Sequence, residues 1–201
     1  MGSDSVAAAL QLGFLSAGAP RVPTIFGEVE RTDLGAGAWV DHCSHWLPGA
    51  DAWFQRVEEN AQWEADQRTM YGRIVDVPRL VWRAKEPAAI VPELGQLRSL
   101  FEQCYGRAFP SITANHYRHG RDSVAIHRDR VRLPGDTVVA IVSLGGRRPF
   151  KIRPDHGGSA LTFGLGHGDL LVMGGTFQAT HQHGVPKVAR AEPRISLMFR
   201  T

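Results

Sequence analysis

Cysteine is scarce in this chain, and long hydrophobic runs are absent. The 201 residues include two cysteines, Cys43 and Cys104, which lie far apart and form no CxxC pair. This usage indicates a reduced, cytoplasmic protein rather than a disulfide-stabilised secreted one. No apolar stretch approaches the roughly 20 residues that span a bilayer, and the first twenty residues contain no basic segment. We therefore expect neither a membrane segment nor a signal peptide.

Neither sign of charge dominates. Lys and Arg number 23 and Asp and Glu 20, which gives a net charge of +3. Such a slight excess permits a polyanionic partner but does not require one. Hydrophobic residues make up 43% of the chain, as is ordinary for a soluble globular protein. The length suffices for one domain with a substantial core.

The N-terminal half is predicted to contain two helices. Asp51 is a suitable cap for the first, and apolar side chains recur after it at helical spacing: Trp53, Phe54, Val57 and Ala61. The second covers residues 92–105, with proline at its start and glycine after its end. Extended segments are expected over residues 25–29 and 75–82.

Beyond Ser111 the sequence changes to short β segments separated by glycine, proline and aspartate. The expected strands cover residues 112–117, 124–127, 137–143, 149–153, 159–163, 169–173, 179–183 and 194–200. Strands at this spacing favour a sandwich or barrel over a βαβ fold, and helices that precede them would cover one sheet. We predict an α+β, mainly β fold, a double-stranded β-helix (jelly roll) with N-terminal helices packed on one sheet. Residues 1–70 would form an N-terminal extension whose helix supports the sheet, and residues 71–201 the main domain of a single fold.

Metal chemistry is suggested by His127-Arg128-Asp129 and by His183 far downstream. Residues two apart on a strand point to one side, so His127 and Asp129 can bind a metal together. Two imidazoles and one carboxylate form the facial triad of non-haem Fe(II) sites. Because the chain has nine histidines, such a motif can arise by chance, and only the motifs around it make a metal site convincing. His181 has the same parity as His183, so periodicity alone leaves both as the third ligand.

Further motifs accompany these residues in order along the chain. They are Asn115-x-Tyr117, His127-x-Asp129, Ser143-Leu144-Gly145, Gly168-Asp169-Leu170-Leu171, His183 and the closing pair Arg194 and Arg200. From Met70-Tyr71 onward, the ordered set resembles the AlkB-type Fe(II)/2-oxoglutarate dioxygenases. In that family the ligand histidine precedes a small residue, a hydrophobic residue and proline, as His183 does here. An aromatic residue often occupies the place of His181, so the resemblance favours His183.

The resemblance implies Fe(II), with 2-oxoglutarate as cosubstrate and dioxygen. By analogy, Arg194 meets the distal carboxylate of 2-oxoglutarate together with Asn115 and Tyr117, while Arg200 lies near the iron-bound carboxylate. Arginine suits this role because its planar fork binds a carboxylate bidentately. Arg194 and Arg200 are six residues apart, an even spacing that places both on one face of a strand.

The implied reaction is oxidative decarboxylation of 2-oxoglutarate to succinate and carbon dioxide, coupled to hydroxylation of a substrate C–H bond. A hydroxylated N-methyl group then sheds formaldehyde. The implied partner is single-stranded nucleic acid or an alkylated nucleotide, and we expect the chain to act as a monomer. A small molecule or a protein is the alternative substrate.

Enzymes that repair alkylated bases take the base out of the stack and hold it against an aromatic surface. Trp82 and Tyr71 are the candidates, although Trp82 suits the core equally well. Arginines around the metal motif would attract phosphates: Arg118, Arg121, Arg128, Arg130 and Arg132. Two positions depart from the family pattern. Val131 replaces an acidic residue of several base-repair members, and Arg128 is a bulky charge where small or neutral residues are frequent; both bear on base recognition.

Overall fold

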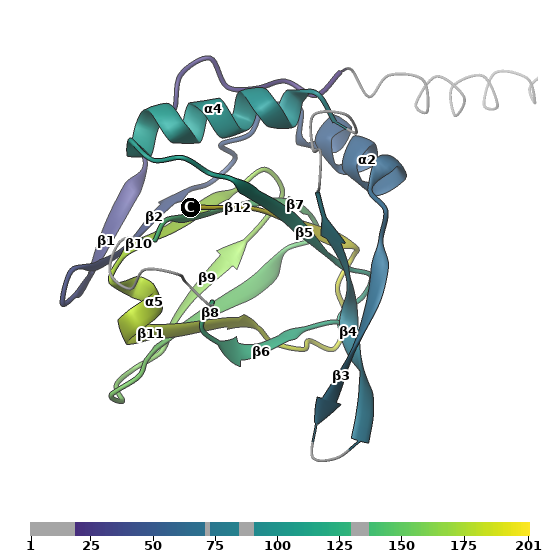
Figure 1. Cartoon of the computed structure of the whole chain (residues 1–201), viewed down its shortest axis with the longest axis vertical. Helices are drawn as coiled ribbons and strands as arrows, with labels where there is room; N and C mark the ends of the chain where they lie inside the picture. The colour runs from purple at the N-terminus through teal and green to yellow at the C-terminus, as the bar shows by residue number, and fades with distance from the viewer. Residues whose placement is uncertain (1–18, 71–72, 85–90, 130–136) are drawn as a thin grey trace, which may run out of the picture.

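The computed structural model describes residues 19–70, 73–84, 91–129 and 137–201. Its strands form two antiparallel sheets that enclose an apolar cluster (Figure 1). The larger sheet has the order β1-β2-β10-β7-β12-β5-β4-β3, and the smaller β6-β11-β8-β9. The larger sheet comprises β1 (Glu30–Gly35), β2 (Ala38–Cys43), β3 (Glu64–Met70), β4 (Arg73–Arg83), β5 (Ser111–Tyr117), β7 (Val139–Gly145), β10 (Leu170–Gly175) and β12 (Arg194–Arg200). The smaller comprises β6 (Val124–His127), β8 (Arg148–Pro154), β9 (Leu161–Leu165) and β11 (His181–Val185).

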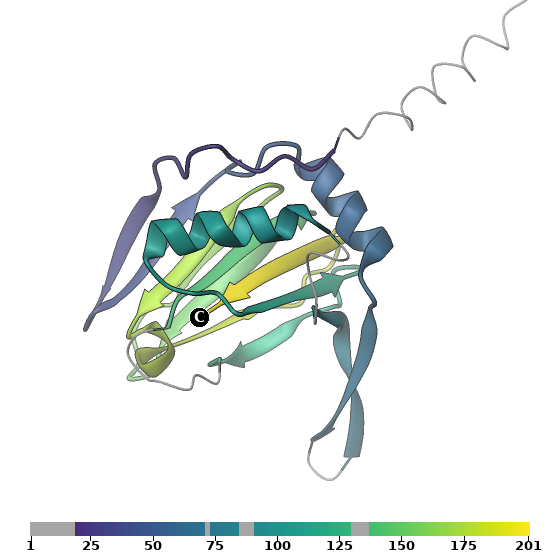
Figure 2. The same ribbon diagram turned by 45° about the horizontal axis from the view of Figure 1, so that its top comes forward.

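Two helices, α2 (Ala50–Asn60) and α4 (Glu93–Tyr105), cover the outer face of the larger sheet. Figure 2 shows α4 lying across this face. Each helix buries an apolar stripe, with Trp53 and Val57 from α2 and Leu94, Leu97 and Phe101 from α4. A short helix, α5 (Phe177–Thr180), joins β10 to β11. None of the described helices is long and apolar enough to cross a bilayer.

Strand β12 separates two cores, because alternate side chains of a strand point to opposite faces. Three of its apolar side chains pack in the cluster beneath the helices: Ile195, Leu197 and Phe199. Met198 points the other way and joins Tyr117 in the cluster between the sheets. The residues that share the parity of Met198 are Arg194, Ser196 and Arg200. The space between the sheets therefore receives the polar groups of this strand.

The predicted fold class is confirmed, and each of the eight expected strands is present with its ends shifted by at most two residues. The strand expected over residues 25–29 is wrong. Phe26 instead packs its ring against Trp46 and two aromatic residues of α4, and the first strand begins at Glu30. The cap predicted at Asp51 is also wrong, because α2 follows the left-handed Gly49 and has no side-chain cap.

The N-terminal residues contribute strands as well as a helix. β2 pairs with β10 over six residue pairs, and β1 pairs with β2 at the sheet edge. The polar stretch Glu64–Met70 forms β3, which pairs with β4 in a hairpin that extends away from the body of the protein (Figure 1). Pairing with β4, rather than an alternation of apolar and polar residues, accounts for the extended conformation of this stretch.

Trp82 belongs to the core beneath the helices, where its side chain is 2% exposed. Trp82→Ala should lower the free energy of unfolding by about 3–5 kcal/mol, because it removes a large buried ring and leaves a cavity. Urea unfolding followed by circular dichroism measures the loss. Leu161→Ala, at a side chain 41% exposed, is the control and should change stability by less than about 0.5 kcal/mol. Equal effects of the two substitutions would contradict the placement of Trp82.

Candidate metal centre and cosubstrate pocket

The pairing of β6 with β11 assembles a cluster of three metal-ligating side chains. The antiparallel register places His183 directly opposite His127, with ring centroids 4.5 Å apart. Asp129 follows the end of β6 and brings Oδ1 to 3.4 Å from His127 Nε2 and 4.0 Å from His183 Nε2. One ligand atom from each residue lies within 4.8 Å of the others. The three residues predicted as ligands thus converge on one point.

Hydrogen bonds orient two of these side chains. His127 Nδ1 lies 2.9 Å from the carbonyl oxygen of Ala125, to which it can only donate, so the lone pair of Nε2 faces the cluster. Arg200 Nε donates to Asp129 Oδ2 at 3.1 Å, which leaves Oδ1 directed at the histidines. The backbone N–H of Asp129 donates to Gln178 Oε1 at 2.9 Å. Nothing in the sequence pattern pointed to Gln178, which lies on α5.

The electrostatic environment favours the ligating forms of both buried groups. Burial lowers the pKa of His183 to about 4, so its imidazole is neutral at neutral pH. Burial alone would raise the pKa of Asp129, but the contact with His127 and the charge and hydrogen bond of Arg200 outweigh it. They hold the pKa of Asp129 well below its usual range. Neutral imidazole and ionised carboxylate are the forms that bind metal, and this donor set fits Fe(II).

His181, the alternative third ligand, lies outside the cluster. Its Nδ1 is 2.8 Å from the Thr180 hydroxyl, and its ring stacks on Phe177 at 5.4 Å. The helix α5 ends one residue before His181, so this side chain packs on the helix while His183 reaches the cluster. The structure therefore brings His183, and not His181, to the metal position.

A pocket of about 910 Å³ opens beside the cluster. Strands β5 and β12 supply one wall through residues that face each other in register, with Asn115 opposite Ser196. Tyr117 and Arg200 also line the pocket. Three of the four residues expected to hold 2-oxoglutarate therefore share one cavity with the three candidate ligands. Thr113 Oγ1 accepts a bond of 2.6 Å from Arg200 Nη1 and so fixes that guanidinium.

Arg194, the fourth expected residue, does not itself line the pocket. It lies opposite Tyr117 in the register, with its guanidinium carbon 5.4 Å from the Tyr117 ring centre. The side chain is fully buried, its Nε donates to the Ser143 hydroxyl at 2.8 Å, and its Nη1 has no hydrogen-bond partner among the described residues. Burial lowers the pKa of this guanidinium. A buried cation with an unused donor fits a carboxylate ligand.

The sequence of the chain matches the family described as the 2OG-Fe(II) oxygenase superfamily over residues 44–200. The chain belongs to the 2OG-Fe(II) oxygenase superfamily. Membership implies Fe(II), 2-oxoglutarate and dioxygen as cofactor and cosubstrates, and the clustered ligands and the buried Arg194 fit the first two. Similar curated proteins support this family membership. Human alpha-ketoglutarate-dependent dioxygenase alkB homolog 3 is 34% identical over 150 residues, which cover 69% of this chain and 50% of the relative.

The DNA oxidative demethylase ALKBH2 of Arabidopsis thaliana is 29% identical to this chain over 212 residues, covering 84% of this chain and 68% of the relative. These relatives confirm the resemblance to the AlkB type. The chain spans about half the length of the alkB homolog 3 proteins that it matches.

Solved structures with a similar fold include an oxidoreductase of the 2OG-Fe(II) oxygenase family from Burkholderia pseudomallei. Its TM-score is 0.58 at 19% identity, over 82% of this chain and 85% of that chain. OsALKBH1 gives a TM-score of 0.58 at 16% identity, over 86% of this chain and 100% of that chain. Both likenesses support the jelly-roll fold of this chain.

The structure corrects the expectation that Trp82 stacks on a substrate base. Register places Val81 opposite Asn115 and Trp82 opposite Ala114. Val81 therefore lines the pocket, while the Trp82 side chain points to the helices and is buried there. Tyr71, the second candidate, lies outside the described residues.

Basic residues at the pocket differ from the predicted arginine cluster. Arg79 and Arg83 of β4 line the pocket together with Arg128, and strand parity with Val81 explains the first two. Arg128 forms an ion pair with Asp155. Of the other predicted arginines, Arg118 is paired with Asp122, Arg121 is exposed, and Arg130 and Arg132 lie outside the described residues.

Metal binding provides the test of the ligand assignment. His183→Ala should weaken Mn(II) affinity, measured by anaerobic titration calorimetry, by more than about 100-fold, since even partners that only orient ligands contribute 10–100-fold. His181→Ala is the matched control, two residues away on the same strand, and should bind Mn(II) like the parent. The reverse pattern would show that His181 is the ligand.

Arg194→Ala should raise the apparent KM for 2-oxoglutarate in succinate formation. Removing one partner of a buried ion pair costs about 3–5 kcal/mol, which corresponds to roughly two to four orders of magnitude. Ser143→Ala removes the hydroxyl that Arg194 contacts but keeps the charge, and should have a much smaller effect. An unchanged cosubstrate dependence of Arg194→Ala, with an unchanged melting temperature, would exclude Arg194 from the site.

Proposed function

We propose that this chain is an Fe(II)/2-oxoglutarate-dependent dioxygenase that oxidatively demethylates N-alkylated bases in single-stranded DNA or RNA. One observation carries the proposal. A single pocket joins the cluster of His127, Asp129 and His183 to the polar face of β5 and β12, which ends at a buried arginine. Metal ligands and the polar groups Asn115, Tyr117 and Arg200 in one cavity, with the buried Arg194 against Tyr117, are what 2-oxoglutarate chemistry requires.

When bound, Fe(II) with 2-oxoglutarate and dioxygen would supply the oxidation of a substrate C–H bond. The protein would supply position. Three side chains would provide three of the six metal ligands, and Arg200 would keep the second oxygen of Asp129 occupied. Asn115, Tyr117 and Arg194 would hold the distal carboxylate. The apolar cluster between the sheets would limit water around these charges.

Nucleic acid as the substrate is supported by the relatives and by the pocket. Two of the relatives are named a DNA oxidative demethylase and an alkB homologue. Arg79, Arg83 and Arg128 surround the pocket, and arginines commonly position phosphates. A volume of about 910 Å³ lies within the usual range of ligand pockets, about 300–1,000 Å³.

A small molecule or a protein is the second candidate substrate, and two observations favour it. Carboxylates already engage two of the rim arginines, Glu64 and Asp66 at Arg83 and Asp155 at Arg128. Among the described lining residues, Tyr117 is the sole Phe, Tyr or Trp, and the cosubstrate would occupy it. Stacking on an extruded base would need a different ring.

Mass spectrometry of methylated oligonucleotides decides between the substrates. Single strands with 1-methyladenine or 3-methylcytosine, incubated with Fe(II), 2-oxoglutarate and ascorbate, should lose one methyl group as formaldehyde, while 2-oxoglutarate is converted to an equal amount of succinate. Oligonucleotide binding should weaken steeply as salt rises, because phosphate contacts release counterions.

His183→Ala is the control and should form neither product. Succinate without demethylation, together with no oligonucleotide binding, would favour the second candidate. Failure to form succinate under any condition would contradict the proposed enzyme class.

A further inference from the structure

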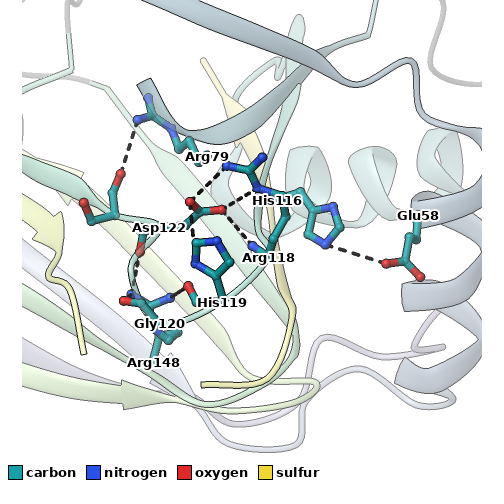
Figure 3. A network of polar contacts seen from close by, with 9 residues as sticks. Glu58, Arg79, His116, Arg118, His119, Gly120, Asp122 and Arg148 are labelled. Atoms are coloured by element: carbon teal, nitrogen blue, oxygen red, sulfur yellow. Dashed lines mark hydrogen bonds and ion pairs between the residues drawn. The ribbon is translucent and has the colours of Figure 1, made fainter. Parts of the chain in front are cut away.

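Arg148, the first residue of β8, is a fully buried arginine outside the expected ligand and cosubstrate sets. Its Nη2 donates to the carbonyl oxygens of Asp122 and Pro186, at 2.8 Å each. Longer contacts reach the carbonyl oxygens of His119, at 3.3 Å from Nη1, and Gly120, at 3.5 Å from Nη2. Figure 3 shows this guanidinium beneath the turn that contains His119, Gly120 and Asp122. All four acceptors are backbone carbonyls.

The four carbonyls belong to two connections of the chain. Residues 118–123 join β5 to β6, and residues 186–193 join β11 to β12. The four strands at the ends of these connections carry His127, His183 and all four candidate cosubstrate residues, and Asp129 follows the end of β6 by two residues. Arg148 therefore holds together the two connections from which the whole site extends.

The two connections are packed tightly at this point. The N–H of Val188 donates to the carbonyl oxygen of Gly120 at 2.8 Å. A Cβ at position 120 would overlap the carbonyl of Val188, so only glycine fits there. Arg118 donates to the Asp122 carboxylate through its N–H at 2.9 Å and its Nε at 2.8 Å, which shapes the first connection (Figure 3). These contacts hold the two connections in place, so the carbonyl oxygens that accept hydrogen bonds from Arg148 have fixed positions.

Arg148 also flanks the cosubstrate wall. Its guanidinium carbon lies 5.4 Å from the ring centre of Tyr117, the same distance as that of Arg194. Burial lowers the pKa of Arg148. A buried guanidinium is costly unless its donors are used. The charge-assisted bonds of Nη1 and Nη2 to the two connections offset part of this cost, while Nε has no hydrogen-bond partner among the described residues.

We propose that Arg148 is a positioning residue for the binding of 2-oxoglutarate. Arg148 connects residues 118–123 to residues 186–193 and thereby holds Tyr117 and Arg194 in place for the distal carboxylate. This inference rests on one part of the proposed function, namely that the protein binds 2-oxoglutarate. It requires no particular oxidised substrate. The guanidinium suits this role because its Nη2 bonds to both segments, at Asp122 and Pro186, while Nη1 adds a longer contact to His119.

Calorimetric titration of Mn(II)-loaded protein with 2-oxoglutarate tests the proposal. Arg148→Met should weaken 2-oxoglutarate binding about tenfold, the scale of a hydrogen bond to a charged group. Arg148→Lys should not restore the affinity, because its ammonium keeps the charge but ends one bond short of Nη2, which bonds to both connections. Arg147→Met is the matched control at the exposed neighbouring arginine and should bind like the parent.

Hydrogen exchange separates positioning from general stability. In Arg148→Lys the amide of Val188 should exchange faster, while amides of β7 and β12 keep the parent rate. In the parent, 2-oxoglutarate with Mn(II) should slow exchange of Val188, because linkage is reciprocal. This last measurement needs no variant and stands even if Arg148→Met fails to fold.

Full affinity in Arg148→Lys, or no effect of 2-oxoglutarate on Val188 exchange, would overturn the proposal. A parent that binds 2-oxoglutarate but demethylates no oligonucleotide refutes the proposed substrate alone, and the role of Arg148 stands. A parent that binds no 2-oxoglutarate refutes both.

Discussion

The register between β6 and β11 is the constraint on which the site depends. It sets His183 directly across from His127, and the chain leaving β6 then needs only two residues to bring in Asp129. A shift of one residue would turn the His183 side chain to the other face of the sheet. Arg200, from the opposite sheet, donates to Asp129 at 3.1 Å. The two sheets therefore meet at a charged contact beside the metal position.

Two strands of the larger sheet extend this arrangement into a cosubstrate wall. β5 and β12 present apolar residues to the helices and polar residues to the space between the sheets. The core beneath α2 and α4 thus stabilises the same strands that carry Asn115, Tyr117 and Arg194. Alternate residues of these strands point to opposite faces, so the face beneath the helices contributes to stability and the face between the sheets to binding. A substitution that one face tolerates can therefore be harmful on the other. Arg148 bonds to the two connections that join these strands to β6 and β11.

Much of this could be predicted from local sequence, and the rest could not for identifiable reasons. Strand positions follow from alternation and turn residues, and His127 and Asp129 follow from their spacing. The choice of His183 over His181 comes from the resemblance to the AlkB-type family, not from periodicity. Trp82 could not be placed, because only the pairing of β4 with β5 decides which face Val81 and Trp82 occupy. Gln178, Ser143 and Asp155 act through contacts with residues distant in sequence, and such contacts leave no periodic signal. The polar strand β3 exists because β4 offers it a partner.

The central claim is that one pocket binds metal and 2-oxoglutarate together. The most direct test is calorimetric titration of 2-oxoglutarate into the parent chain with and without saturating Mn(II). A shared site predicts one 2-oxoglutarate per chain and an affinity that rises about tenfold or more with the metal, a coupling typical of linked sites. Equal affinity in both titrations would show that the metal and the carboxylate do not meet in this pocket, and would contradict the account.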